Sequence, residues 1–224
     1  MAAHPSQYTF DLPHAVSYAP HDFVVTDSNR DAHAVATRAV AWAAPVMAIT
    51  GPEGSGKTHL AHVFAHLHAA RFIAVAQLGE ILAETLLEGA DAFVLELPDM
   101  VVQEEALAQL INAALAKQVL LLVTSRIPLA QRVVKRPDLG SRFKAIPEVV
   151  LQAPDDALLV ALFAKAFADR QVRAGEDVVL YLVKRIERSG AQVARLVAQL
   201  DAKALAAGQA LSVPFVRDTL ADFR

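Results

Sequence analysis

The chain has 224 residues, and 54% of them are hydrophobic, which is enough for one large domain or for a core with a smaller companion. It contains no cysteine, so disulfides and thiolate metal sites are excluded, and a cytoplasmic location is expected. The formal net charge of −3 does not attract nucleic acid, so we expect no direct sequence-specific DNA binding. Apolar runs such as residues 119–123 are far shorter than a membrane-spanning helix, and residues 1–18 lack a signal-peptide pattern.

The first 20 positions are rich in Pro, His and small residues and show no helical or strand period, so we interpret them as a flexible tail. After Phe23 the pattern becomes regular, and Ser28 is expected to cap a helix that carries Ala32 to Trp42. Residues 45–51 then predict a buried strand. A loop and a long helix over residues 58–69 follow.

Further short apolar runs at residues 71–76, 92–97 and 119–125 alternate with helical stretches such as residues 104–116. Strands that alternate with helices predict a parallel sheet with helices on both faces.

After residues 146–154 the strands stop, and helical spacing begins behind the start signal at Pro154, Asp155 and Asp156. Another helix is expected after the break at Ser189 and Gly190, and a last one near Ser212. We therefore predict an α/β class protein, with a small all-α domain after the core. The expected divisions are a tail at 1–20, an α/β nucleotide-binding domain at 21–152 and a helical lid domain at 153–224.

A phosphate-binding motif, GPEGSGKT at residues 51–58, satisfies the pattern GxxxxGK[ST] between a predicted strand and a predicted helix. Its glycines let backbone N–H groups surround phosphates, Lys57 reaches the β and γ oxygens, and the Thr58 hydroxyl can hold Mg²⁺. A chance glycine-rich turn is the alternative, which the matching context disfavours. We expect ADP or ATP with Mg²⁺ to bind here. The expected ligands are Gly51, Pro52, Glu53, Gly54, Ser55, Gly56, Lys57 and Thr58.

Four histidines follow on the predicted helix after this motif, at His59, His62, His66 and His68. The spacing of the first three places them near one face, so a metal site is one interpretation. We favour the other, in which the helix packs beside the sheet with its imidazoles hydrogen-bonded or hydrated, because no carboxylate partner is recognised.

The predicted strand at residues 93–95 ends in Glu96 and Leu97, where P-loop proteins commonly carry two adjacent acids. Glu96 is expected to face Mg²⁺ through water, whereas Leu97 cannot activate water and Asp99 is expected in a loop. Because a water-activating group contributes roughly 10²- to 10⁴-fold in rate, we expect nucleotide binding with weak or absent intrinsic ATPase activity. The alternative is that Glu96 is only a strand-end acid and that the hydrolytic acid lies elsewhere.

Six basic residues lie close together in the sequence with only Asp138 opposing them, and we interpret them as a solvated face. They are Arg126, Arg132, Lys135, Arg136, Arg142 and Lys144.

Several of these motifs resemble the AAA+ module of the DnaA family, and the resemblance runs from Phe23 to the C-terminus. The segments that carry it are FVVTDSNRDAHA at 23–34, GPEGSGKTHLAH at 51–62, LLVTSRIP at 121–128 and PDLGSRF at 137–143. The chain is most similar to the Hda group, short homologues that inactivate the replication initiator. The resemblance implies an AAA+ P-loop NTPase core and a lid, without the N-terminal and helix-turn-helix domains of DnaA. It also implies that Phe23, Asn29 and His59 contribute to nucleotide binding.

The resemblance also implies that Arg142 is an arginine finger that acts on ATP in a neighbouring DnaA subunit, an effect worth roughly 10³- to 10⁵-fold in related systems. The alternative is a surface arginine paired with Asp138. A negative regulator of replication initiation that holds ADP is the implied function. A nucleotide-locked interaction module and an ATPase of the helicase or clamp-loader type remain alternatives, and a homodimer stays open.

In the Hda group the tail carries a peptide that docks on the DNA polymerase sliding clamp. The matching residues here are Gln7 as polar anchor, Phe10 and Leu12 as apolar anchors, and Tyr8 where the family more often has Leu. An extended peptide would place alternate side chains in apolar pockets. Alternatively, Phe10 and Leu12 pack on the core.

Sensor residues are implied at the polar strand end, Thr124 or Ser125, and on the lid. The lid slot falls at Ala194, with Arg195 one place along and Arg188 as another candidate. One residue along a helix rotates a side chain by about 100°, so both arginines stay open.

Overall fold

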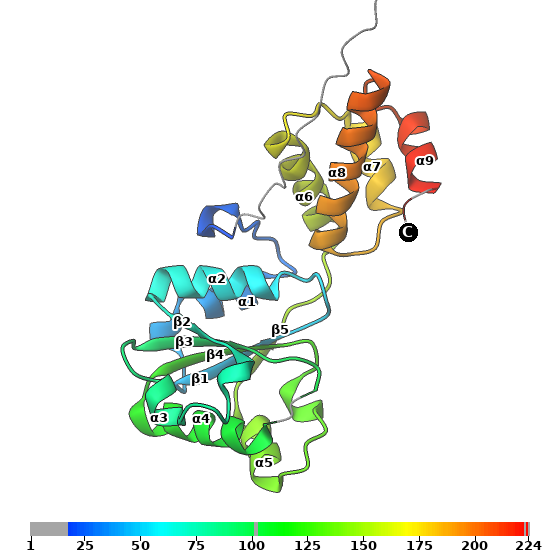
Figure 1. Cartoon of the computed structure of the whole chain (residues 1–224). Helices are drawn as coiled ribbons and strands as arrows, with labels where there is room; N and C mark the ends of the chain where they lie inside the picture. Colours follow the sequence, from blue (N-terminus) through cyan, green and yellow to red (C-terminus); the bar gives the residue numbers. More distant parts are fainter. Residues whose placement is uncertain (1–17, 101–102, 222, 224) are drawn as a thin grey trace, which may run out of the picture.

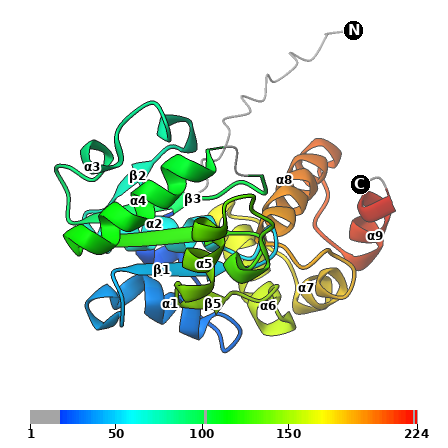
Figure 2. The same cartoon turned by 90° about the horizontal axis from the view of Figure 1, so that it is seen from below.

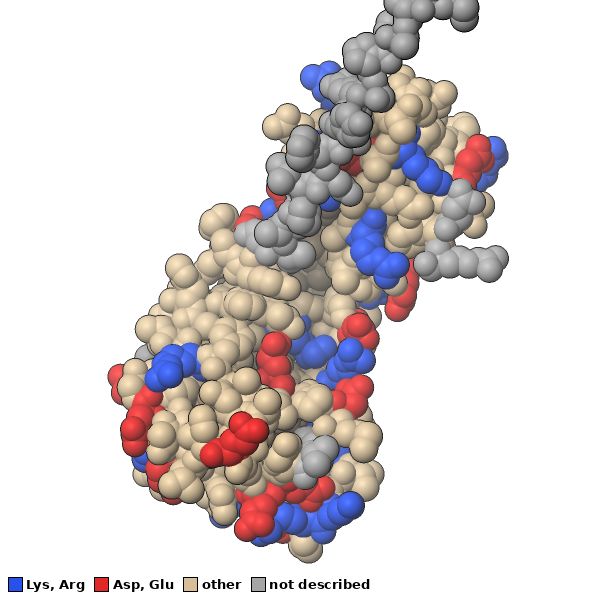
Figure 3. All heavy atoms as spheres, in the orientation of Figure 1, with Lys and Arg blue, Asp and Glu red and all other residues tan. Residues whose placement is uncertain are grey.

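The computed structural model of the chain describes residues 18–100, 103–221 and 223. An α/β core lies below a group of helices in Figure 1. Acidic and basic side chains are interspersed over the face that Figure 3 shows. Within the described residues, no helix has both the length and the apolar character needed to cross a membrane. The candidate clamp-binding residues Gln7, Tyr8, Phe10 and Leu12 lie outside the described residues.

A parallel sheet of five strands forms the centre of the core, in the order β2-β3-β4-β1-β5, which confirms the predicted parallel sheet. Its register places Thr50 opposite Ser125 and Glu96 opposite Thr124, so β1, β3 and β4 end at one edge. The strands are β1 Val46–Thr50, β2 Arg71–Ile73, β3 Ala92–Glu96, β4 Leu120–Ser125 and β5 Glu148–Val150.

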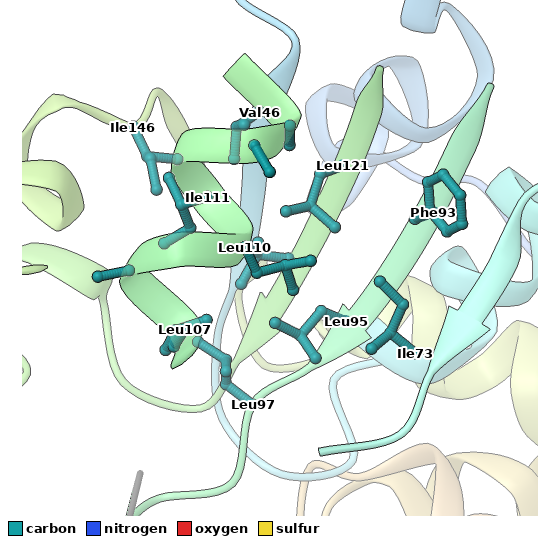
Figure 4. Close-up of a cluster of buried hydrophobic side chains, with 14 of the residues drawn as sticks. Val46, Ile73, Phe93, Leu95, Leu97, Leu107, Leu110, Ile111, Leu121 and Ile146 are labelled. Atoms are coloured by element: carbon teal, nitrogen blue, oxygen red, sulfur yellow. The ribbon is translucent and has the colours of Figure 1, made fainter. Parts of the chain in front are cut away.

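Helices cover both faces of the sheet because successive strand side chains point to opposite sides. Val94 packs with α1 and α2, whereas Phe93 and Leu95 pack with α3, α4 and α5 on the other face. Figure 2, seen from below, shows α4 and α5 lying over the sheet. Figure 4 shows the hydrophobic side chains that pack between α4 and the strands. The helices are α1 Arg30–Thr37, α2 Lys57–His68, α3 Ala83–Leu86, α4 Glu104–Lys117 and α5 Pro137–Ala145.

The first helix is shorter than predicted, and Asn29 rather than Ser28 stands at its N-cap. The Asn29 side chain accepts from the Thr26 N–H at 2.9 Å and donates to the Val24 carbonyl at 2.9 Å, so it orders the loop before the helix. At the other end, the Thr37 hydroxyl donates to the His33 carbonyl at 2.8 Å, a local bond that competes with helix continuation. A separate 3-10 turn, Ala39–Ala41, follows.

Four further helices form the lid, with its own buried cluster that includes Phe163, Leu182 and Leu196. As predicted, one begins behind Asp155, whose carboxylate accepts from the Leu158 N–H at 2.7 Å. Another begins behind Ser189, while the α7 helix had no sequence prediction. The helices are α6 Asp156–Asp169, α7 Glu176–Val183, α8 Gly190–Ala207 and α9 Val213–Ala221.

Replacing Phe163 with Ala tests this lid core, because its side chain has no exposed surface. We expect the free energy of unfolding to fall by about 3–5 kcal/mol, from lost burial and the resulting cavity. The control is Leu205→Ala, since Leu205 is 69% exposed on α8, and its change should stay within about 0.5 kcal/mol. Urea denaturation measures both, and equal losses would contradict the assignment of the lid core.

Candidate nucleotide-binding site

The phosphate-loop motif lies between β1 and α2, at the edge where β1, β3 and β4 end. The Gly51 N–H donates to the Ser125 carbonyl at 3.1 Å, which anchors the start of the loop on β4. Gly54 and Gly56 have φ values of +71° and +104°, in the left-handed region that favours glycine. The loop and the N-terminus of α2 thus form the arrangement that the motif predicts.

The two residues predicted to serve Mg²⁺ meet at this edge, although they are far apart in sequence. The Thr58 hydroxyl donates to a Glu96 carboxylate oxygen at 2.8 Å, and Lys57 Nζ donates to the Pro52 carbonyl at 2.6 Å. Hydroxyl and carboxylate oxygens suit a hard cation such as Mg²⁺. Burial lowers the pKa of Lys57, and the nearby guanidinium of Arg126 lowers that pKa further.

Two hydroxyls at the loop are buried and have no hydrogen-bond partner among the described residues. They belong to Thr50, the last residue of β1, and to Ser55 within the loop. Buried polar groups in proteins are normally paired, so unpaired hydroxyls beside a glycine-rich loop fit a site that receives a polar ligand. The residues present therefore fit a phosphate-bearing ligand.

The position of the second acid is taken by a core residue. Leu97 is 6% exposed and packs in the cluster below the sheet, beside Leu107 in Figure 4. Its N–H donates to the Thr124 carbonyl at 2.8 Å. Asp99 lies in a bend beyond the end of β3, as expected. Leu97 thus stabilises the sheet and α4 instead of activating water.

An ion-pair bridge closes one side of the loop. Arg126 follows β4, and its Nη2 lies 2.9 Å from Glu53 Oε2 while its Nη1 lies 3.5 Å from Asp99 Oδ2. The interpretation of Arg126 within a basic face opposed only by Asp138 was wrong, because these acids come from segments distant in sequence. Spacing along the chain gave no signal for this pairing.

Arg132 also departs from that interpretation, since it is only 8% exposed. Its guanidinium donates to the Ser125 hydroxyl at 2.6 Å, to the Asp99 carbonyl at 3.0 Å and to the Pro98 carbonyl. Burial lowers the pKa of Arg132, but these acceptors satisfy its charged form. The Ser125 hydroxyl also donates to the Ile127 carbonyl at 2.6 Å. Of the two strand-end sensor candidates, Ser125 is therefore engaged with its own neighbours, and the other, Thr124, is buried.

The helix α5 carries Arg142 on its surface. Asp138 pairs with Arg136, with an Nε–Oδ1 distance of 3.1 Å and an Nη2–Oδ2 distance of 3.0 Å, so the alternative pairing with Arg142 was wrong. Arg142 is exposed and makes no ion pair with any described residue. The Glu104 carboxylate accepts from the N–H groups of Lys135 and Arg136, which ties the first turn of α4 to the start of α5. Arg142 is thus free for another molecule.

Aromatic residues at the start of the described chain lie against α2. Phe23 contacts His59 edge-on at 5.1 Å and stacks with His33 at 5.6 Å between ring centroids, and a Cβ on Gly56 would lie 3.5 Å from its ring. Tyr18 stacks on His62 at 4.4 Å. These imidazoles pack against rings, and the described residues contain no cluster of three His, Asp or Glu side chains that could hold a metal ion. Phe23 and His59 therefore lie beside the phosphate loop.

Asn29, the other residue implied by the resemblance, is 4% exposed. Its amide is bonded within its own loop, as described for α1. It orders the segment that leads to Phe23 rather than presenting its amide at the surface.

The lid touches the phosphate loop directly. The Gly190 N–H at the start of α8 donates to the Gly54 carbonyl at 3.0 Å, and a Cβ on Gly54 would lie 1.9 Å from Ser189 Oγ. A second contact joins Lys165 of α6 to Asp22, with 2.8 Å between Nζ and Oδ1. The N-terminus of α8 therefore lies over the loop.

The two lid arginines lie in different places. Arg188 donates to the Pro154 carbonyl at 3.1 Å and pairs with Asp156 at 2.6 Å, at the junction between core and lid. Arg195 lies over the ring of Phe223, 5.8 Å from its centroid, within the lid. Only Arg188 adjoins the Ser189 turn that contacts the loop, and the sensor role of either stays a prediction.

Comparison with known proteins agrees with this geometry. Residues 155–220 match the family model described as "Hda, lid domain". No curated protein matches the sequence. Domain III of DnaA from Thermotoga maritima is 17% identical with a TM-score of 0.78, and the match covers 92% of this chain and 96% of that one. This chain has the fold of DnaA domain III, with a C-terminal segment that matches the Hda lid-domain model.

Other solved structures are similar to this chain as well. AMPPCP-bound DnaA from Aquifex aeolicus is 16% identical with a TM-score of 0.71, covering 83% of this chain and 65% of that one. A RuvB mutant from Thermotoga maritima is 18% identical with a TM-score of 0.68, covering 92% and 72%. At these identities the structures establish the fold alone, and the predicted α/β core with a parallel sheet, followed by a helical lid, is confirmed.

The contact between the lid and the phosphate loop can be tested at Gly54. The Cβ of an alanine at position 54 would push Ser189 away. The alanine would also have to adopt the left-handed backbone conformation of Gly54, which alone costs about 1 kcal/mol. The matched control is Gly208→Ala, because Gly208 has a φ of +62° but nothing within 4 Å of its added Cβ. We expect Gly54→Ala to lower the free energy of unfolding more than Gly208→Ala, and to speed hydrogen exchange at the start of α8. Equal effects would contradict a lid docked on the loop.

The pH dependence of stability provides another test, at His59. Burial lowers the pKa of His59, and the charges of His62 and Lys165 lower it further, against opposing effects of Asp22 and a backbone hydrogen bond. The unfolded chain then binds the proton more readily, so stability is lost as pH falls through the unfolded value of about 6.5. We expect His59→Gln to reduce this loss between pH 7 and 5.5 in urea denaturation. The exposed His66→Gln is the control on the same helix, and an unchanged slope in His59→Gln would contradict the assignment.

Proposed function

We propose that this chain is a DnaA-like AAA+ protein, which holds an adenine nucleotide and promotes ATP hydrolysis by DnaA in trans, as a negative regulator of replication initiation. One observation carries the proposal: a complete phosphate loop stands beside a strand end whose second position is the buried Leu97. Such a site can bind phosphates without supplying the usual water-activating acid. Binding without rapid turnover suits a subunit that regulates a partner.

The nucleotide part of the proposal rests on residues already in place. Lys57 and the loop N–H groups would bind phosphate oxygens, and Thr58 with Glu96 would hold Mg²⁺. Mg²⁺ at this place would neutralise phosphate charge. Phe23 and His59 lie where they could flank the base. The similarity to a DnaA structure that contains AMPPCP supports an adenine nucleotide, and ADP is the form we propose for the resting protein.

The action in trans rests on Arg142. A guanidinium that is exposed and free of ion pairs within the described residues can enter a neighbouring site and stabilise charge on a transferring phosphoryl group. The match to the Hda lid supports DnaA as the neighbour. The DNA polymerase sliding clamp is the further proposed partner, through Gln7, Tyr8, Phe10 and Leu12.

The test is a single-turnover measurement of ATP hydrolysis by DnaA with DNA-loaded clamp and this protein. The native chain should accelerate hydrolysis, and Arg142→Ala should lose most of the effect, because such fingers are worth roughly 10³- to 10⁵-fold. Lys144→Ala is the matched control, since it removes the same charge from an exposed position on the same helix and should retain stimulation.

Other outcomes select the alternative functions. Full stimulation by Arg142→Ala would contradict the finger, and no stimulation by the native chain would favour a pure interaction module. Rapid ATP turnover by the isolated chain would instead favour an ATPase in its own right.

A further inference from the structure

The lid follows the core through a connecting segment that has no regular structure. The strand β5 ends at Val150 and α6 begins at Asp156, and residues 151–155 between them adopt neither a helix nor a strand. A segment of this kind can absorb the backbone rotations of a hinge. The position of the lid therefore depends on its non-covalent contacts with the core.

Residues 18–23, which we call the strap, lie between α2 of the core and α6 of the lid, where Figure 1 shows a dark blue turn. Pro20–Asp22 form a 3-10 turn that begins with a proline, which fixes one backbone angle. Within it, the Asp22 N–H donates to the Ala19 carbonyl at 2.9 Å, and the Phe23 N–H donates to the Pro20 carbonyl at 3.3 Å. The strap is therefore a short unit with its own hydrogen bonds.

Ring contacts fasten the strap to α2. Tyr18 stacks on His62 with 4.4 Å between ring centroids, and Phe23 contacts His59 edge-on at 5.1 Å. Between these contacts, His59 Nε2 lies 3.1 Å from the Ala19 carbonyl oxygen. Because α2 begins at the phosphate loop, the strap is attached to the helix that would orient a bound phosphate.

An ion pair fastens the strap to the lid. Lys165 Nζ lies 2.8 Å from Asp22 Oδ1, and these two side chains are only 31% and 18% exposed. The same ammonium lies 3.0 Å from Asp169 Oδ2, one turn further along α6, where the carboxylate is 56% exposed. Partial burial strengthens an ion pair, because water screens the charges less than at an open surface. Movement of the lid away from the core would separate Lys165 from Asp22 and leave its pair with Asp169 intact.

We propose that the strap holds the lid closed over the phosphate loop and so slows the release of a bound nucleotide. The effect on release rests on the proposed nucleotide binding, whereas the hold on the lid rests on the contacts of the strap. The lid contacts the loop through Gly190 and Gly54, so a lid that moves away uncovers the loop. The pair of Lys165 with Asp22 must break during this movement, because its members belong to different parts of the protein. Each intact pair therefore makes opening less frequent.

Spin labels on the core and the lid measure the position of the lid without any nucleotide. The chain has no cysteine, so Asn112→Cys on α4 and Ala202→Cys on α8, at exposed positions, provide unique attachment sites in the full chain. Pulsed dipolar spectroscopy should give a narrow distance distribution with the native strap and a broader one with Lys165→Met or Asp22→Asn. The matched control is Asp169→Asn, which removes the other partner of Lys165 and should leave the distribution unchanged.

The rate of nucleotide release is measured by displacing N-methylanthraniloyl-ADP with excess ADP in the presence of Mg²⁺. Lys165→Met and Asp22→Asn should each raise the dissociation rate by roughly three- to tenfold, the range that one charge-assisted contact supports. Asp169→Asn should change this rate by less than about twofold, because the exposed pair lies within one helix. In the double variant Asp22→Asn with Lys165→Met, the rate should equal that of the single variants, since both remove the same contact. Thermal melting of each variant verifies that it is folded.

The outcomes separate this inference from the proposed function. A distance distribution that Lys165→Met leaves unchanged, or that Asp169→Asn broadens equally, overturns the strap. A broadened distribution with an unchanged dissociation rate, or effects that multiply in the double variant, overturns its control of release. If the native chain binds no nucleotide, the proposed function fails, while broadening confined to the Lys165 and Asp22 variants still supports the hold on the lid.

Discussion

The hydrogen bond from the Gly51 N–H to the Ser125 carbonyl joins the phosphate loop to β4, and the rest of the site depends on this junction. It fixes where the loop begins relative to the central strands, and the parallel register then brings Glu96 to the same edge. The helix α2 starts from the loop, which places Thr58 within hydrogen-bond distance of Glu96. One backbone contact and one strand register thus assemble groups that are separated along the chain.

From that junction, contacts continue towards the surface that carries Arg142. Ser125 holds the buried Arg132, whose other donors bind the carbonyls of Pro98 and Asp99 beyond β3. Farther along, Glu104 ties α4 to the start of α5, the helix of Arg142. The exposed guanidinium is therefore mounted on a packed helix rather than on a free loop. A packed helix would hold the guanidinium in a defined place, which the proposed action in a partner's site requires.

The lid also contacts the site, because the N-terminus of α8 is hydrogen-bonded to the Gly54 carbonyl of the phosphate loop. A nucleotide held by this loop would thus lie where core and lid meet. Lys165 and Asp22 add a second link between lid and core, near the aromatic contacts of Phe23. The N-terminal part of the described chain therefore contacts both parts of the protein.

The sequence predicted those features that depend on local patterns. The phosphate loop, the central strands and the helices behind Asp155 and Ser189 follow from glycine spacing, apolar runs and capping residues. Hydrogen bonds of two side chains, Asn29 at the start of α1 and Thr37 at its end, accompany bounds that periodicity alone does not resolve. The ion pairs of Arg126 and the burial of Arg132 arise from contacts between distant segments, so spacing gave no indication of them.

The measurement that tests the central claim most directly is the nucleotide content of the purified chain. Protein freed of unbound nucleotide is denatured, and the released adenine nucleotide is identified and counted for the native chain and for Lys57→Ala. The account predicts close to one adenine nucleotide per native chain, chiefly ADP, and almost none from the variant. A native chain that releases no nucleotide, and binds none when ADP and Mg²⁺ are added in excess, would contradict it.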